Sequence, residues 1–387
     1  MRTSIQIGRI IGIPIRLHFT FLFILPLILV TFAEGPGPMG LGEAEELSRF
    51  LRYSVAGIAA SLFFLSLLLH EMSHSYVAMK YGTKIKSITL FIFGGLALME
   101  DLPRDPEKEW RIAIAGPLMS FALGGLFLFT YLGIRAVNVV IYEPFRILIS
   151  SIGLLNLVLA TFNLLPAFPM DGGRVLRALL AQRMQFLKAT RRAVFVGKTF
   201  AVVLGIIGFM PDPFLLYSTG EVRILFSPWL TLIAAFLFIA ATEEESATII
   251  YAALEGTKVR AVMRAENTVV PQSIRIAELE EKMRREKNAE YAVVNESGDL
   301  KGLITFNELK KLSVEQRHSL TVSALMNPLD PMRDTISEGE EAIEALKRML
   351  GNKKNSLAVV EEGSGRIAGI ITKRDLSMHV ELLKGNT

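Results

Sequence analysis

Two histidines and a glutamate lie within five residues of one another at the end of a long apolar segment. The run His70-Glu-Met-Ser-His74 follows the uncharged stretch 54–69. Residues four apart share one face of a helix, so both imidazoles can reach one metal ion while Glu71 acts on a water beside it. The spacing therefore predicts a helical zinc site that activates water, placed at or within a membrane.

Asp171 is the best-placed third ligand for this ion. It lies near the end of the run Asn163-Leu-Leu-Pro-Ala-Phe-Pro-Met-Asp171-Gly-Gly, which closes another apolar segment. Such polar and helix-breaking residues are costly in lipid, so we expect them to face a cavity. A catalytic zinc takes three protein ligands and a water, and the chain has no cysteine to offer. The alternative role for Asp171 is to cap a helix over residues 174–182.

Composition places this chemistry in a membrane protein. The 387 residues are 51% hydrophobic and 21% charged, and the charges gather in the last third. Six apolar segments are near the length that crosses about 30 Å of hydrocarbon. They are residues 17–32, 54–79, 112–134, 147–165, 193–209 and 228–240. The sequence therefore predicts six transmembrane helices followed by a polar tail.

The distribution of cations predicts the orientation of these helices. Arg2, Arg9 and Arg16 precede the first segment, further cations fill the connection between the fourth and fifth, and glutamates follow the first. By the positive-inside rule, both ends of the chain and the tail are cytoplasmic. The net charge of +4 is accounted for by topology. Since no stripe of basic and aromatic residues accompanies it, we expect no nucleic-acid partner.

Residues 84–99 alternate in side-chain character and reach Gly94-Gly95 near their end. This stretch is too short to span and has the residues of a strand. Strand backbone at membrane depth must be buried in protein or line a cavity, which predicts a re-entrant hairpin beside the active site. A strand lying on the membrane surface is the alternative. Further on, Ala115-Gly-Pro-Leu118 offers small residues for close packing against the histidine-bearing helix.

His70-Glu-Met-Ser-His74 and the run from Asn163 to Asp171 resemble the two defining motifs of the site-2 protease family of intramembrane zinc metalloproteases. The resemblance covers about the first 240 residues and includes the hairpin and Ala115-Gly-Pro-Leu118. It implies one zinc held by His70, His74 and Asp171, with Glu71 as catalytic base and Asn163 beside the reacting carbonyl. Ser120 stands where this family often has Asn, a departure that we expect to leave the ligands unchanged.

The same resemblance implies that the substrates are transmembrane proteins within the lipid bilayer. A substrate helix hides its carbonyls in its own hydrogen bonds, so it must unwind before attack. We expect the unwound strand to pair with the hairpin at 84–99, which would satisfy the exposed backbone groups.

The polar tail contains an internal repeat. Val259-Arg-Ala-Val-Met263 recurs as Val322-Ser-Ala-Leu-Met326, and each copy continues with an amphipathic helix, a strand, a turn and a second strand. Each unit is too small to bury a full core, so we expect the two to pack as one α/β domain.

The repeats resemble a tandem pair of cystathionine-β-synthase (CBS) domains, which commonly bind adenine nucleotides between the repeats. The resemblance assigns nucleotide contacts to Thr305, Thr372 and Asp375. Glu308 replaces the corresponding Asp in the first repeat, which counts against a second nucleotide site. A homodimerisation module without ligand is the alternative for the pair.

The expected architecture is a polytopic α-helical membrane protein with a re-entrant β-hairpin and a cytoplasmic CBS pair. Its divisions are a membrane-embedded metalloprotease domain at 1–242, a linker at 243–256, and CBS repeats at 257–315 and 316–387. The expected activity is hydrolysis of peptide bonds in or near transmembrane helices, with adenine nucleotide as regulator. The alternatives are a CBS-regulated ion transporter, which needs no His70-Glu71 and Asp171 set, and a catalytically inactive membrane scaffold.

Overall fold

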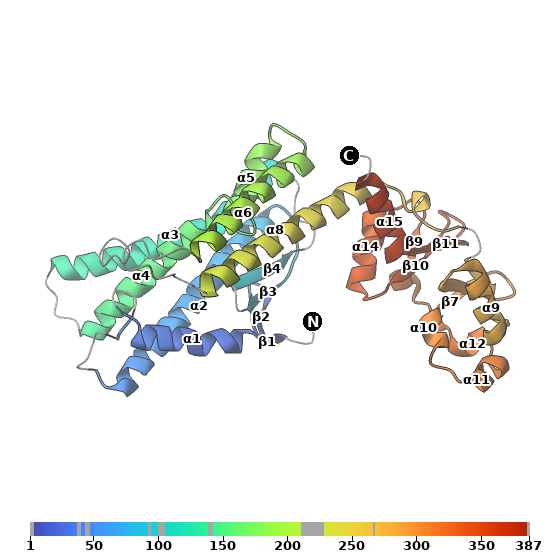
Figure 1. Cartoon of the computed structure of the whole chain (residues 1–387), viewed down its shortest axis with the longest axis horizontal. Helices are drawn as coiled ribbons and strands as arrows, with labels where there is room; N and C mark the ends of the chain where they lie inside the picture. The colour runs from blue at the N-terminus through green and yellow to red at the C-terminus, as the bar shows by residue number, and fades with distance from the viewer. Residues whose placement is uncertain are drawn as a thin grey trace. The chain divides into compact units, whose positions relative to one another are not determined.

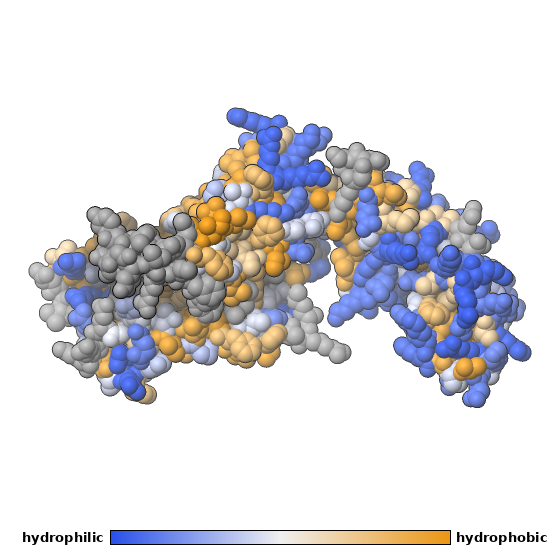
Figure 2. All heavy atoms as spheres, viewed as in Figure 1, coloured by the Kyte–Doolittle hydropathy of each residue, from blue (hydrophilic) through white to orange (hydrophobic). Residues whose placement is uncertain are grey.

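The computed structural model divides the chain into two units, Met1–Glu245 and Ser246–Thr387 (Figure 1). It describes residues 4–36, 40–42, 47–91, 94–99, 105–137, 142–209, 228–265 and 268–384. Hydrophobic side chains cover much of the helical surface of the first unit, whereas hydrophilic side chains dominate the surface of the second (Figure 2).

The helices of the first unit follow the apolar segments of the sequence. They are α1 (Phe21–Glu34), α2 (Arg49–Lys80), α3 (Pro106–Ala136), α4 (Glu143–Asn163), α5 (Asp171–Ala181), α6 (Phe186–Ile207) and α8 (Pro228–Leu254), whose last residues belong to the second unit. The α3 helix starts cleanly because the Asp105 side chain accepts a hydrogen bond from the Glu107 amide and Pro106 occupies the first turn. It packs along α2 and α4 and also contacts α5.

Among the described residues, α2, α3 and α4 are long and apolar enough to cross a membrane. Large apolar side chains such as Leu126 and Phe129 are exposed on α3, as expected for a surface that faces lipid. The α1 helix is apolar but has only 14 residues. The structure therefore bears out an α-helical membrane unit with three candidate spans.

A four-stranded sheet covers one side of α2. Its strands are β1 (Ser4–Ile10), β2 (Ile13–His18), β3 (Ile85–Phe91) and β4 (Gly94–Met99), in the order β1-β2-β3-β4. The pair β3 and β4 is the hairpin expected from residues 84–99. Side chains of the sheet, including Ile15 and Ile88, pack on Met72 of α2. The sheet thus lies against the helix that carries His70 and His74.

The start of the first apolar segment was predicted wrongly. Residues 17–32 were expected to form one helix, but Leu17 and His18 end strand β2 and the helix starts at Phe21. The strand forms because Ile13, Ile15 and Leu17 alternate with other residues and pair with β1 on one side and with β3 on the other. The parallel pairing of β2 with β3 joins residues more than seventy positions apart, so it cannot be predicted from a local sequence pattern.

The second unit contains the two expected repeats, each with a small sheet. Its elements are η1 (Val259–Ala261), β5 (Val269–Pro271), α9 (Ile276–Glu286), β6 (Glu290–Val294), β7 (Leu300–Thr305), α10 (Phe306–Leu309), α11 (Val314–Ser319), α12 (Val322–Leu325), β8 (Asn327–Pro328), α13 (Pro331–Asp334), β9 (Thr335–Ser337), α14 (Ala342–Gly351), β10 (Ser356–Val360), β11 (Ile367–Thr372) and α15 (Lys373–Lys384). The sheets have the orders β5-β6-β7-β8 and β11-β10-β9.

The two repeats of this unit share a hydrophobic core. Ala292 and Leu303 of the first sheet are buried together with Ala358 and Ile370 of the second. The backbone of Arg264 also pairs with that of Ile370, which ties the start of the first repeat to the last strand of the second. The repeats therefore pack as one domain, as the small size of each suggested.

Candidate metal centre

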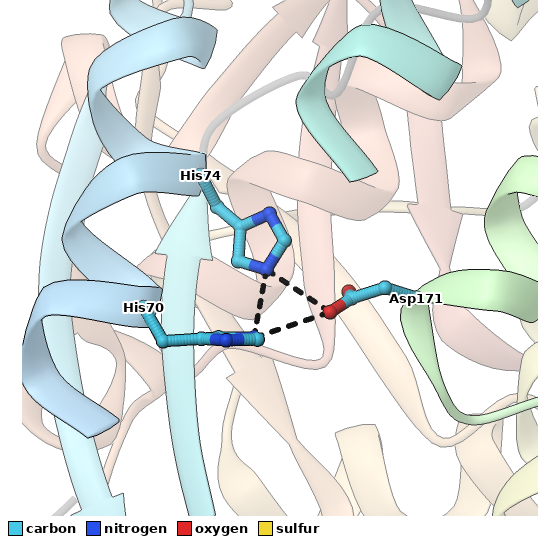
Figure 3. Close-up of side chains that lie close together, drawn as sticks. All are labelled: His70, His74 and Asp171. Atoms are coloured by element: carbon cyan, nitrogen blue, oxygen red, sulfur yellow. Dashed lines mark hydrogen bonds and ion pairs between the residues drawn. The ribbon is translucent and has the colours of Figure 1, made fainter. Parts of the chain in front are cut away.

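His70, His74 and Asp171 converge on one point, although Asp171 is about one hundred residues away in the sequence (Figure 3). The two histidines lie one turn apart on α2, and Asp171 is the first residue of α5. Asp171 Oδ2 lies 3.2 Å from His70 Nε2 and 3.1 Å from His74 Nε2. The two Nε2 atoms are 3.2 Å apart. Both histidines are buried.

The other nitrogen of each imidazole is held by α3. His74 Nδ1 donates to the Ile112 carbonyl at 2.7 Å, and His70 Nδ1 lies 2.9 Å from Ser120 Oγ. Because a carbonyl can only accept, the neutral His74 ring carries its hydrogen on Nδ1 and presents a lone pair at Nε2. Such partners fix the ring orientation at metal sites. The Nε2 atoms of both rings are thus directed toward Asp171.

The spacing of these three donor atoms fits a zinc ion. Ligand atoms about 2.0–2.1 Å from zinc at tetrahedral angles lie about 3.3 Å from one another. The three distances in this cluster are 3.1–3.2 Å. Two imidazole nitrogens and a carboxylate oxygen that meet at one point are the types of donor that zinc takes in proteins. The residues therefore fit zinc, with the fourth position left for water.

Asp171 reaches the histidines because α4 ends shortly before it. Pro166 and Pro169 cannot continue α4, which ends at Asn163, and α5 begins at Asp171. The first turn of α5 lies tightly against the preceding segment, since a Cβ atom at Gly172 would be 2.2 Å from the Leu165 carbonyl oxygen. The helix-capping alternative for Asp171 does not describe this geometry, because Met170 occupies the capping position.

Gly116 of α3 faces the two imidazoles directly. A Cβ atom there would lie 2.2 Å from His74 Nε2 and 2.6 Å from His70 Nε2. The sequence suggested only that small residues allow α3 to approach the histidine-bearing helix. The structure shows that the approach is to the donor atoms themselves. It also places Ser120 in contact with His70, a connection that the sequence did not indicate.

Glu71 lies on the same helix, half-buried, against strand β4. A Cβ atom at Gly95 would come within 2.3 Å of Glu71 Cγ, so the bare backbone of this strand borders the carboxylate side chain. The Glu71 charge interacts with those of His70, His74 and Asp171. A carboxylate beside a metal position and a strand backbone is placed to exchange a proton with a reacting water.

Asn163, the other predicted catalytic residue, is half-buried at the last position of α4. Its side-chain Nδ2 donates to the Leu159 carbonyl at 2.9 Å, one turn earlier in the same helix. Nδ2 has a second hydrogen and the amide has an oxygen, so this bond leaves further capacity for a ligand. The side-chain hydrogen bond of Asn163 is thus made within its own helix.

In the second unit, Thr372 and Asp375 contact each other at the start of α15. Asp375 Oδ2 accepts from the Thr372 amide at 2.9 Å and from its hydroxyl at 2.7 Å. Thr305 and Glu308 form the same arrangement at the start of α10. Both pairs therefore act as capping boxes. Burial raises the pKa of Glu308, but hydrogen bonds from the Thr305 hydroxyl and amide lower it more, to below the usual value.

A cavity of about 280 Å³ lies beside Thr372, between the two repeats. Its lining is strongly basic: Arg264, Lys287, Lys373 and Arg374 contribute to it, with Glu290 as the acidic member. The Arg264 guanidinium contacts Asp375 at 3.1 Å and Asn288 Oδ1 at 2.7 Å. Such a cavity suits an anion. Asp375 itself stands behind Arg264 rather than in the lining.

Comparisons with known proteins agree with both resemblances. The model of peptidase family M50 matches residues 58–142 and 133–206, and that of the CBS domain matches residues 259–315 and 322–381. The chain is 33% identical to a zinc metalloprotease of Methanocaldococcus jannaschii over 99% of this chain and 98% of that one. It is also similar to the solved site-2 protease from Methanocaldococcus jannaschii, with 36% identity, a TM-score of 0.41, and coverage of 62% of this chain and 95% of that chain.

Proposed function

Because the chain belongs to peptidase family M50 and carries two CBS domains, we propose that it is an intramembrane zinc endopeptidase that cleaves transmembrane proteins. The observation that carries this proposal is the convergence of three donor atoms, two of them on a helix long and apolar enough to span. Metal-dependent hydrolysis of a peptide needs a site of this kind with an acid next to it. Neither an ion transporter nor an inactive scaffold requires it.

In the proposed mechanism, the bound ion would make a water more acidic and polarise the peptide carbonyl. His70, His74 and Asp171 would hold the ion. Glu71 accepts the proton of the water and later donates it to the leaving amine. Asn163 lies in the segment that leads to Asp171, and the second hydrogen of its Nδ2 would stabilise the oxyanion, an interaction worth about 3 kcal/mol in comparable sites.

The substrate would bind as an added strand. Within the described residues β4 is an edge of the sheet, so its outer backbone groups can pair with another strand. Gly95 of this strand touches Glu71, which places the pairing edge next to the proposed base. An unwound substrate segment on β4 would thus bring its backbone to the metal centre.

The same proposal includes the arrangement in the membrane. Six helices would cross the bilayer, with α1, α6 and α8 joining the three candidate spans, and both chain ends would be cytoplasmic. The protease domain would occupy 1–242 and the linker 243–256, with CBS repeats at 257–315 and 316–387. Three cations near the start of α6, Lys188, Arg191 and Arg192, support a cytoplasmic position for that end of the helix.

We expect one zinc per chain, lost together with proteolysis when the ligands are removed. Purified protein should cleave a transmembrane-helix substrate, stop when a chelator is added, and recover with zinc. The double variant His70→Ala, His74→Ala should contain no zinc, because a single carboxylate does not hold the ion. His318→Ala, an exposed histidine in the second unit, is the matched control and should keep it. One equivalent of zinc in the double variant would contradict the site assignment.

We also propose that an adenine nucleotide binds the cavity at Thr372 and regulates proteolysis. The basic lining supports an anionic ligand, and the phosphates would lie near Arg264 and Lys373. Asp375 would exchange its contact with Arg264 for one with the ribose hydroxyls. If no nucleotide binds, the pair would serve as a homodimerisation module.

Asp375→Ala should lower nucleotide affinity about tenfold to a hundredfold, because a charge-assisted hydrogen bond contributes about 1.5–3 kcal/mol. Glu308→Ala is the matched control. It breaks the equivalent capping box in the first repeat and should destabilise the domain to a similar extent without changing affinity. Calorimetry and thermal shifts of the full chain with ATP, ADP and AMP measure both. Absence of binding at millimolar nucleotide would refute the regulatory ligand.

A further inference from the structure

A buried arginine joins three helices next to the metal centre. Arg177 of α5 donates through Nε to Glu109 Oε1 of α3 at 2.8 Å, and Nη2 donates to the same oxygen. Its Nη1 donates to Glu244 Oε1 of α8 at 2.7 Å. Arg177 and Glu109 are only 7% and 4% exposed, so both charges are taken out of water. All three residues belong to the first unit.

Two aromatic rings hold the guanidinium in this position. Its carbon lies 4.9 Å from the ring centre of Phe168 and 4.9 Å from that of Phe186. Phe168 is 1% exposed and precedes Asp171 by three residues. Arg177 therefore contacts the segment that leads into Asp171 as well as the helix that begins with it.

The Glu109 end of this contact lies on the face of α3 that orients the imidazoles. Glu109, Ile112, Gly116 and Ser120 follow one another at helical spacing and all are buried. Ile112 and Ser120 hold the histidine rings, and Gly116 lies against their donor nitrogens. The same face of α3 thus determines where the rings of His70 and His74 lie.

We propose that Arg177 is a positioning residue, which sets Asp171 relative to His70 and His74 by fixing α5 to this face of α3 and to Glu244. The proposal rests on the proposed zinc site and deepens it. Two of the metal donors are oriented directly by α3, and the third arrives on a separate helix. A contact between α3 and α5 is what determines whether the third donor lies at ligand distance from the other two.

The contact between Arg177 and Glu109 is better explained by the position it gives to α5 than by a contribution to the stability of the fold. Replacing both partners of a buried ion pair by apolar residues of similar volume is often neutral or stabilising, because the charges no longer need to be desolvated. The guanidinium donates two N–H groups to one Glu109 oxygen and a third to Glu244, and together with its two flanking rings it defines one orientation of α5. Residues that orient metal ligands typically contribute about ten- to a hundredfold to metal affinity or activity.

The test compares the double variant Glu109→Met, Arg177→Met with the wild type, as purified full-length protein. Thermal unfolding reports the fold, competition with a chelator gives the zinc affinity, and the visible absorption of the cobalt-loaded protein reports the coordination geometry. We expect an unfolding temperature close to that of the wild type, zinc affinity lower by about ten- to a hundredfold, and altered cobalt bands. Lys198→Met removes the ion pair between α6 and Glu245 and should change neither metal readout.

Glu244→Gln provides a second variant at the more hydrated end of the contact, and should lower zinc affinity less and in the same direction. Wild-type zinc affinity and cobalt bands in the variants that fold would overturn the proposal, as would an equal loss in Lys198→Met. These readouts need no peptide substrate. A wild-type protein that binds zinc and cleaves nothing would therefore refute the proposed function while the comparison of metal affinities still decides the role of Arg177.

Discussion

Glu71→Gln should abolish proteolysis and leave zinc in place. Glutamine keeps the size and polarity of the side chain but cannot accept the proton of the attacking water or return it to the leaving amine. Removal of a general acid and base typically lowers the rate by about a hundred- to ten-thousandfold. Because Glu71 is not among the three converging donors, metal content should stay at one equivalent.

Cleavage of a transmembrane-helix substrate and metal analysis of the same sample measure both quantities. Glu107→Gln is a suitable control, since it removes an exposed carboxylate on the neighbouring α3 that pairs with Arg111. It should cleave at the wild-type rate. Proteolysis by Glu71→Gln within a fewfold of wild type would show that another group handles the proton, and loss of zinc would make Glu71 a ligand.

Gly116→Ala should remove both metal and activity although it adds a single methyl group. The added carbon would stand 2.2 Å from His74 Nε2, far inside contact distance. The His74 ring cannot turn away without breaking the bond of Nδ1 to the Ile112 carbonyl. Either α3 moves away from α2 or the donor nitrogens leave their positions, and we expect zinc affinity to fall about a hundredfold or more.

Gly125, which lies more than two turns after Gly116 in α3, provides the control for this change. A Cβ atom at Gly125 would meet nothing closer than 3.9 Å. Gly125→Ala should therefore keep zinc and stabilise the helix by about 0.5–1 kcal/mol, because alanine loses less backbone entropy on folding. Metal analysis and thermal unfolding of the two variants test the pair. Full zinc occupancy in Gly116→Ala would contradict the close approach.

Local patterns accounted for the elements that carry the candidate site. The spacing of His70 and His74 is meaningful only on a helix, and the uncharged run before them made that helix long enough to recognise within α2. In the second unit the repeat predicted one amphipathic helix in each copy, and α9 and α14 are these helices. Such features depend on residues a few positions apart, whose physical effects add up along the segment.

Contacts between distant segments could not be predicted in this way. Leu17 and His18 of strand β2 were assigned to a membrane helix, because the pairing of this strand with β3 depends on residues far along the chain. Arg177 looked like one of several cations in a connection that marks orientation, and its contact with Glu109 spans 68 positions. A buried charge without a partner is destabilising, so buried charges are found in pairs. Which residues form a pair depends on the packing of the helices, and this packing is not visible in a local pattern.

The bare backbone at Gly116 and Gly95 changes how related genes should be interpreted. A search for His-Glu-x-x-His followed by Asp-Gly selects chains by their reactive groups. The space for these groups, however, depends on the absence of a side chain at Gly116 of α3 and at Gly95 of β4. A descendant gene that keeps every reactive residue and acquires alanine at position 116 would pass such a search and encode a protein unable to hold the metal. Inactive members of a lineage can thus arise by gain of a methyl group, and an inventory of proteases in a genome should examine these two positions as well.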